Sequence, residues 1–210
     1  MVFSVASTWA GMAAAVLLAD FVSGVVHWAE DAYARFKPQR RLPLINTIAL
    51  DNALHHRRPR DFLARGWWAS SWDLVLLGTL VLAGACWLDR MSAAVLLFVL
   101  LAVNANQIHK WTHRNPRENP WLVTRLQRLY LLQTPRHDGR HHQGEKNSHY
   151  CVVTNFLNPL LEEVGFWRRL ERLVERLLNR QANRQAKRLA GRLEKPLEKR
   201  EPGERPSTSV

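Results

Sequence analysis

Cysteine is scarce in this chain of 210 residues, which contains only Cys86 and Cys151. The two are far apart in sequence, so they offer no disulfide framework and are expected to be free thiols. The chain also lacks a phosphate-binding glycine loop, a dinucleotide fingerprint and a motif for a nucleophilic serine or cysteine triad. Its net charge is +12, yet it has no zinc-finger, RNA-binding or helix-turn-helix signature. We therefore expect no nucleic-acid partner, and anionic lipid headgroups are the better match for the basic charge.

Long apolar runs, in contrast, are present. Residues 9–28, 67–88 and 91–111 each provide about the 20 residues that a helix needs to cross the hydrocarbon layer. The first run could be a signal peptide, but no Lys or Arg precedes it and Asp20 interrupts it, which favours a retained span. The sequence thus predicts an all-α integral membrane protein with about three transmembrane helices.

Positive charge is distributed very unevenly around these runs. Of the 30 Lys and Arg residues, Arg90 alone lies in the link between the second and third runs, and three spans would place all the others on the opposite side. The positive-inside rule makes that opposite side the cytoplasm. Every histidine then lies on the cytoplasmic side or at its interface, which predicts a cytoplasmic histidine-rich cap.

The polar segments are expected to contain further helices. Residues 46–58 could form a short helix that ends before Pro59, and residues 121–133 are apolar but too short and too Arg-rich to cross, which favours an interfacial helix. Residues 162–193 have apolar positions at helical spacing and many basic ones, as in an amphipathic helix on an anionic leaflet. Beyond Pro196 the composition is typical of a disordered tail.

Nine histidines are the main chemical feature of the chain. Neutral imidazole is a ligand for iron, zinc and copper, and histidines one turn apart on a helix can face the same ion. Most of the nine lie near the ends of apolar runs or in the polar stretches between them, in clusters spaced HH, HxxxH and HxxxHH: His27, His55, His56, His109, His113, His137, His141, His142 and His149.

The clusters differ in how strongly they indicate a metal. His109 and His113 share one helix face at the end of the third run, although two interfacial histidines would look the same. The segment from His137 to His142 supplies three imidazoles and the carboxylate of Asp138, against the alternative of a solvated histidine-rich loop. The adjacent pair at 55 and 56 is a weak signal by itself. All these clusters are expected on the same face of the membrane, which favours a metal centre.

Two acidic residues, one in the first run and one just after it, bear on that centre. His27 alone would more often be an interfacial histidine than a ligand. Asp31 follows it by four residues and could accept its other ring N–H in a second-shell role. Asp20 is an acid within a span, which is costly unless it is paired or functional. We expect it, like Asp31, to support the metal ligands without binding the ion itself.

The number of nitrogen donors limits the choice of metal. A structural zinc site needs four ligands, typically including cysteines, and copper favours fewer histidines or a cysteine and methionine set. About eight histidines with an occasional carboxylate would suit two iron ions and oxygen activation.

Several motifs together resemble the lipid desaturase family. They are DFVSGVVHWAED at 20–31, HHRRP at 55–59, NQIHKWTH at 106–113 and the segment 132–171, which runs from LQTPRHDGRHH to FWRRLE. The resemblance extends over roughly residues 15–172. The family includes plasmanylethanolamine desaturase, bacterial homologues in light-induced carotenoid regulation and a plant plastid desaturase acting on phosphatidylglycerol.

This resemblance implies a membrane-embedded non-haem di-iron centre that uses dioxygen and two electrons from a small carrier, such as a cytochrome b5-like protein or a ferredoxin. In the plasmalogen branch the reaction removes hydrogen from the 1-O-alkyl chain of an ether phospholipid and leaves a vinyl ether. Asp20 and Asp31 match family acids. The positions that match family histidines are His27, His55, His56, His109, His113, His137, His141 and His142.

Two departures from the family pattern concern its histidine boxes. The last box usually reads HHxxHH, and here Asp138 replaces its second histidine. The run after the HHxxP element lacks the usual histidine, because Pro59 is followed by Arg60, Asp61 and Phe62. Asp138 could ligate iron through oxygen, and His149 could enter the ligand shell in compensation.

The expected function is therefore that of a membrane-bound di-iron lipid desaturase, with an alkyl ether phospholipid as the first choice of substrate. An acyl-chain phospholipid desaturase and a hydroxylase are alternatives with the same centre, and a membrane adaptor with a structural metal is the non-enzymatic alternative. We expect a desaturase domain over residues 1–172, a basic helix over 173–195 and a tail over 196–210. The expected location is a bacterial inner membrane, with the histidine site and the C-terminus cytoplasmic.

Overall fold

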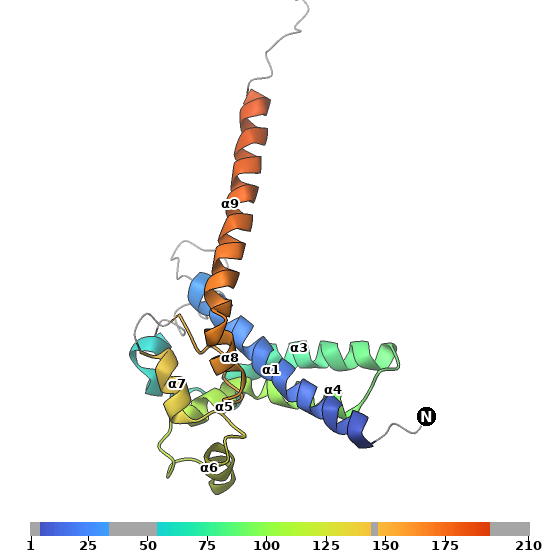
Figure 1. Ribbon diagram of the computed structural model, residues 1–210, viewed down its shortest axis with the longest axis vertical. Coiled ribbons are helices and arrows are strands. Elements are labelled where there is room, and N and C mark those ends of the chain that lie inside the picture. The colour runs from blue at the N-terminus through green and yellow to red at the C-terminus, as the bar shows by residue number, and fades with distance from the viewer. Residues whose placement is uncertain (1–4, 34–53, 144–146, 194–210) are drawn as a thin grey trace, which may run out of the picture. The chain divides into compact units, whose positions relative to one another are not determined.

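The computed structural model describes residues 5–33, 54–143 and 147–193 (Figure 1). Within those ranges the chain forms helices, turns and loops, and no strand. It divides into two compact units, Met1–Trp167 and Arg168–Val210. The predicted helix at 46–58 lies outside the described residues except for its end, where residues 54–57 are helical. The predicted tail at 196–210 also lies outside them.

Among the described residues, two helices are long and apolar enough to cross a membrane. They are α1 (Val5–Tyr33), from Thr8 onward, and α3 (Trp67–Trp87). A third span is formed if α4 (Ala93–Val103) and α5 (Ala105–Thr112) are taken together, although they are bent by 52° with respect to each other. The all-α membrane fold is thereby confirmed, with the first span extending beyond residue 28 to Tyr33.

The bend in the third span occurs at Asn104. Its side-chain amide donates a hydrogen bond to the Leu100 carbonyl, and its side-chain oxygen accepts one from the indole N–H of Trp67. A side chain that competes in this way for backbone groups is a recognised cause of helix bending. The bend changes the direction of α5, which contains His109.

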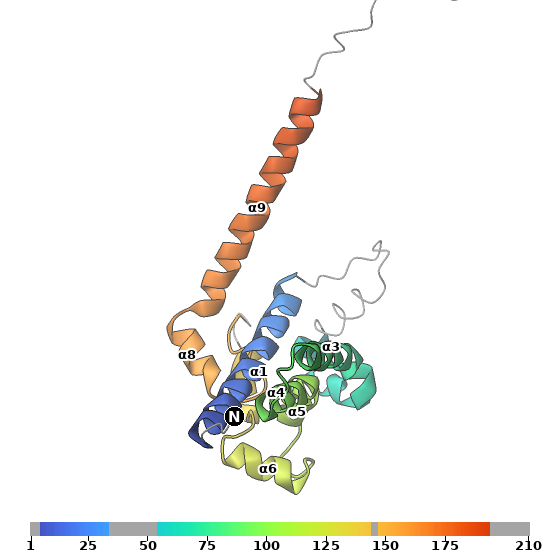
Figure 2. The ribbon, with the colours of Figure 1, turned by 90° about the vertical axis from the view of Figure 1, so that its right-hand side faces the viewer.

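The spans form a layer in which α4 packs against both α1 and α3 (Figures 1 and 2). The link between α3 and α4 lies at one end of this layer. At the other end lie α5, the short helix η1 (Pro59–Ala64) and α7 (Pro135–His141), as Figure 1 shows. The histidine-containing segments are therefore gathered at the end opposite the α3–α4 link, as the sequence predicts.

One face of α1 holds the segment at 150–154 through buried polar contacts. The Asp20 carboxylate accepts hydrogen bonds from the backbone N–H groups of Val153 and Thr154 and from the Thr154 hydroxyl. One turn further along, Gly24 lets this segment approach closely, because a Cβ there would lie 2.6 Å from Cys151 Sγ. Val152 and Val153 in turn pack into a small apolar core with Ala105, Ile108 and their neighbours.

The remaining helices of the first unit are short. α6 (Trp121–Arg128) ends earlier than the predicted 121–133, since the backbone turns at Tyr130, which has a φ of 59°. α7 begins where its sequence favours a helix start. Thr134 caps it by accepting a hydrogen bond from the His137 N–H, and Pro135 occupies the first turn.

The predicted C-terminal helix is present with a later start. Residues 162 and 163 belong to a separate helix, α8 (Leu157–Glu163), and Gly165, with a φ of 59°, comes between it and α9 (Phe166–Leu193). A glycine in this left-handed conformation commonly ends a helix. In α9, Leu173, Leu177 and Leu178 are exposed.

Candidate metal centre

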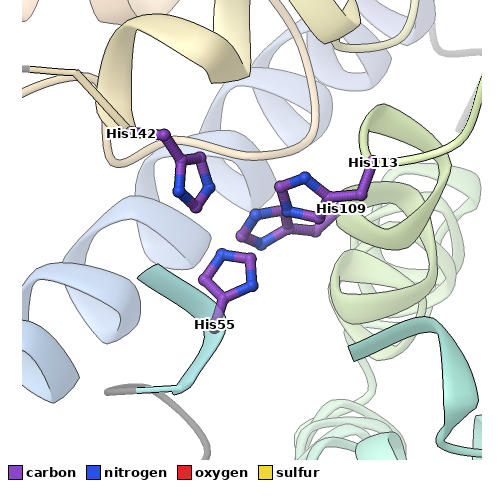
Figure 3. Close-up of side chains that lie close together, drawn as sticks. All are labelled: His55, His109, His113 and His142. Carbon is purple, nitrogen blue, oxygen red and sulfur yellow. The ribbon is translucent and has the colours of Figure 1, made fainter. Parts of the chain in front are cut away.

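The structure brings eight side chains into two groups, each of which could hold a metal ion. The first group contains His55, His109, His113 and His142, whose rings point toward a common space (Figure 3). In each group, one ligand atom from each member lies within 4.8 Å of those of the other three. The second group consists of His27, Asp31, His56 and His141.

Sequence spacing explains how the residues are divided between the groups. His109 and His113 are four residues apart at the end of α5, so both face the first group. His27 and Asp31 have the same spacing on α1, and both face the second. Adjacent residues on a helix point about 100° apart, and accordingly the pairs 55–56 and 141–142 each contribute one residue to each group.

Three histidines of the first group, His55, His113 and His142, are held as neutral rings. Burial, followed by the neighbouring His109 and His113, lowers the pKa of His55 far below its usual range. Burial also lowers the pKa of His113 to about 3 and that of His142 to about 4. Both ring nitrogens of His55 and of His142 are buried without a hydrogen-bond partner. Neutral rings with unused lone pairs are what metal ligation requires.

The second group has oriented rings. His27 donates from Nδ1–H to the Tyr150 carbonyl over 3.2 Å, and His141 donates from Nδ1–H to the Ser148 carbonyl over 2.7 Å. Because a carbonyl only accepts, Nε2 of each ring carries the free lone pair, and both Nε2 atoms are buried without a hydrogen-bond partner. Hydrogen bonds from the distal ring nitrogen to a carbonyl are typical of metal-ligating histidines.

Asp31 takes part in the second group directly. Its Oδ1 lies 2.8 Å from His56 Nε2, and its Oδ2 lies 3.4 Å from His141 Nε2. The sequence suggested that Asp31 accepts the other ring N–H of His27. In the structure, the acceptor of that N–H is the Tyr150 carbonyl. The structure instead puts its carboxylate among the potential ligand atoms.

Four other residues expected at the site have different surroundings. His137 and His149 lie outside both groups and face each other, with ring centroids 5.4 Å apart. Asp138 lies beside the first group, buried against His109, His113 and His142. The Asp20 carboxylate binds the backbone at residues 153 and 154.

The two groups adjoin each other. The ring centroids of His27 and His109, one from each group, are 5.2 Å apart, and those of His55 and His56 are 5.6 Å apart. A site of this kind could hold two ions near each other. Imidazole nitrogens with carboxylate oxygens are a donor set that iron accepts, so these residues fit an iron centre.

A cavity of about 280 Å³ reaches both groups. His27, His55 and His109 lie in its wall, and the rest of the wall comes mostly from α1, α3, α4 and α5. Its apolar side chains include Ala19, Val22, Val26, Trp72, Leu74 and Ala102. Sequence reasoning did not predict this cavity, because its lining residues look like ordinary lipid-facing positions in the apolar runs.

Polar side chains also line the cavity. Glu30, Arg65 and Asp73 are among them, together with Ser70 and Asn106. The cavity is therefore amphipathic, with charged groups as well as a hydrocarbon-like wall close to the histidines. This combination suits a ligand that has both a polar part and an alkyl chain.

Together, the fold and the site define a membrane protein with a buried histidine-rich centre that opens into an amphipathic cavity. The family model of the lipid desaturase domain matches residues 16–185. The chain belongs to the lipid desaturase family and is an oxidoreductase whose substrate is a membrane lipid. The resemblance noted in its motifs is thereby confirmed.

Individual relatives agree with this assignment. A protein named Probable fatty acid desaturase, from Acanthamoeba polyphaga mimivirus, is 34% identical over 164 residues, which cover 75% of this chain and 78% of the viral protein. Plasmanylethanolamine desaturase 1 of Mus musculus is 29% identical over 177 residues, covering 78% of this chain and 64% of the mouse protein. Plasmanylethanolamine desaturase of Myxococcus xanthus is 29% identical over 182 residues, covering 80% and 62%. The chain thus spans less than two thirds of the mouse and Myxococcus proteins. No solved structure matches it.

Proposed function

We propose that this protein is a di-iron lipid desaturase that dehydrogenates a phospholipid alkyl chain, with a 1-O-alkyl ether lipid as substrate and a vinyl ether as product. The observation that supports this most is the pair of adjoining ligand groups at the wall of one amphipathic cavity between the spans. Two of the relatives are named plasmanylethanolamine desaturases, which favours the ether substrate.

The two ligand groups would each hold one iron ion. The first would use four imidazoles, and the second three imidazoles with the Asp31 carboxylate. Bound iron would supply the oxygen activation and hydrogen abstraction that no side-chain base can perform on an unactivated methylene. The carbonyls of Ser148 and Tyr150 hold His141 and His27 in the tautomer that leaves Nε2 free for the ion.

The chain's own part in the reaction is to position the substrate. The apolar wall of the cavity takes the alkyl chain out of the bilayer and keeps water away from it. The polar groups in the same wall, including Glu30, Arg65 and Asp73, would lie near the headgroup and the glycerol. A lipid bound in this way presents chain carbons to the side of the cavity formed by the histidines.

An electron donor would reach the metal centre from the aqueous side of the membrane at which the histidines lie. The positive-inside rule places the histidine-containing end of the spans in the cytoplasm, where a small carrier such as a ferredoxin or a cytochrome b5-like protein can dock. A bacterial inner membrane is the location that suits this orientation. The orientation can be tested by cysteine labelling. Single cysteines are introduced at residue 90 or 117 of a variant that lacks Cys86 and Cys151, and intact cells are treated with a thiol reagent that does not cross the membrane. Labelling at residue 117 from outside the cells would contradict the orientation.

Lipid analysis tests the substrate. The chain is expressed in a host that contains alkyl ether phospholipids, and lipids are measured before and after mild acid treatment. Vinyl ethers release aldehydes in acid, whereas unsaturated acyl esters do not. We expect acid-labile product from the wild type and none from the His113→Ala variant at equal membrane content. Absence of acid-labile product from an iron-loaded wild type would rule out the ether substrate.

An acyl-chain desaturase is the second candidate, because the mimivirus relative is named a probable fatty acid desaturase. In the same experiment it would give new unsaturated acyl chains that survive mild acid. A hydroxylase would give an oxygenated chain of higher mass. Metal analysis of the purified protein separates all of these from an adaptor, since an enzyme of the proposed kind binds about two irons per chain and an adaptor binds a single structural ion or none.

A further inference from the structure

Asp138 stands where the family's last histidine box has a histidine, and its surroundings differ from those of an ordinary buried acid. It is 2% exposed. Its Oδ1 lies 3.2 Å from His109 Nε2, and its Oδ2 lies 3.4 Å from His113 Nδ1 and 3.6 Å from His142 Nε2. Three of the four members of the first group therefore surround this carboxylate.

These distances match those between ligands of a common ion. With metal–ligand bonds of about 2.1 Å, two neighbouring ligands of one ion are separated by about 3.0–3.5 Å. Oδ1 and His109 Nε2 are close enough for a hydrogen bond, yet both are buried without a hydrogen-bond partner. Two buried polar atoms without hydrogen-bond partners can both be satisfied by one bound cation.

Charge supports the same conclusion. A buried carboxylate is unfavourable unless it is paired with a positive charge or binds a metal. In the described part of the chain, the ionisable side chains that pair with Asp138 are histidines. No Lys or Arg side chain of the described residues forms an ion pair with Asp138, so a bound cation would supply the compensating charge.

We propose that Asp138 is a direct carboxylate ligand of the metal ion held by the first group. That ion would then have an oxygen donor in addition to its imidazoles, as the second group already has in Asp31. A carboxylate supplies a negative charge and a harder donor than imidazole, which favours iron over copper. The proposal rests on the proposed function, and it concerns the ligand set of this chain alone.

Helix geometry explains why Asp138 can take this place while His137 does not. Asp138 and His142 are four residues apart at the end of α7, so they project toward the same group. His137 points about 100° away and faces His149. The carboxylate is thus on the correct face of the helix to complete the first group.

Cobalt(II) binding to the full-length protein in detergent tests the proposal, because its visible spectrum reports the number and type of ligands. Metal-free wild type, Asp138→Ala, Asp138→Asn and Asp138→His are titrated with cobalt(II). The control is Asp61→Ala, which removes an exposed carboxylate of η1. We expect two ions in the wild type and in the control.

Removal of the ligand should affect one ion only. In Asp138→Ala and Asp138→Asn, one ion should bind roughly 10–100-fold more weakly, and its spectrum should change to that of a lower coordination number. The ion of the second group serves as an internal control for folding. Asp138→His should retain both ions. The absorption bands of the cobalt(II) ion in the first group should shift toward those of a site with nitrogen ligands alone.

The outcomes separate this proposal from the proposed function. If Asp138→Ala and Asp138→Asn bind both ions with wild-type affinity and spectrum, Asp138 is not a ligand, and the di-iron assignment is unaffected. If one ion weakens while its spectrum stays that of the wild type, Asp138 only orients His113, which also overturns the proposal. A wild type that binds fewer than two ions would contradict the proposed function itself.

Discussion

At the scale of single residues, the hydrogen-bond partner of one ring nitrogen of a histidine determines whether the other ring nitrogen is available to a metal ion. His27 and His141 each donate to a backbone carbonyl, and that contact directs the remaining lone pair into the second group. His137 has no place in either group, although its sequence position matches a family histidine. Family position and local geometry thus disagree at this residue.

Comparison of two histidines of α7 tests this difference. His141→Ala should abolish product formation and lower the metal content, because it removes a member of the second group. His137→Ala should retain both ions and most of the activity. Metal per chain and lipid product are measured on the same purified samples. Equal loss of metal in the two variants would show that His137 is also a ligand.

Asp20 offers a second test at this scale. Asp20→Ala leaves the N–H groups of Val153 and Thr154 buried without an acceptor, at a cost of about 1–3 kcal/mol each. We expect a clearly lower unfolding temperature in detergent, with metal per folded chain unchanged. Loss of metal without loss of stability would instead show that Asp20 supports the metal ligands, as the sequence suggested.

At the scale of elements, the site depends on how closely α1 approaches the segment at 150–154. That segment presents Tyr150 to His27 and the Val153 N–H to Asp20, so it couples the first span to the ligand groups. Gly24 allows this approach. A shift of α1 would displace His27 and Asp31 together, because both lie on this helix.

Two glycines in spans provide a matched pair for this point. A Cβ at Gly24 would lie 2.6 Å from Cys151 Sγ and 3.1 Å from the Cys151 nitrogen, so Gly24→Ala should destabilise the protein by about 1–3 kcal/mol. A Cβ at Gly84 meets nothing within 4 Å, and Gly84→Ala should be neutral or stabilising by up to about 1 kcal/mol. Unfolding midpoints in detergent measure both changes. Equal midpoints would mean that the close approach at Gly24 does not matter for stability.

At the scale of the whole molecule, function requires a lipid to reach buried ligands from within the bilayer. The cavity makes this possible, because it joins the apolar wall of the spans to the histidines of both groups. In the proposed function, the spans act both as membrane anchor and as substrate-binding surface. Blocking the cavity should therefore weaken substrate binding while metal binding stays unchanged.

Ala102→Phe is designed to do this, since Ala102 lines the cavity and is not a member of either ligand group. We expect product formation to fall roughly 10²-fold through displacement of the substrate, with two ions retained. Ala83→Phe, on an exposed part of α3, is the control and should keep wild-type activity. Product per iron is the quantity to compare. An unaffected Ala102→Phe variant would place the substrate elsewhere.

The sequence by itself determined the helical membrane fold and the gathering of the histidines on one side. Both follow from local properties, since apolar runs of sufficient length cross the bilayer and the residues that follow them lie at its surface. Local helix geometry also placed His109 and His113 on one face. The general nature of the site could therefore be predicted from short stretches of the chain.

Only the tertiary structure decided how the ligands are divided. It brought residues of α1, of the segment before η1 and of α7 into one group, placed Asp31 and Asp138 beside imidazoles, and left His137 outside. It also formed the cavity from residues of several helices. These features depend on contacts between residues far apart in the chain, which arise when helices pack against each other and which no local spacing specifies.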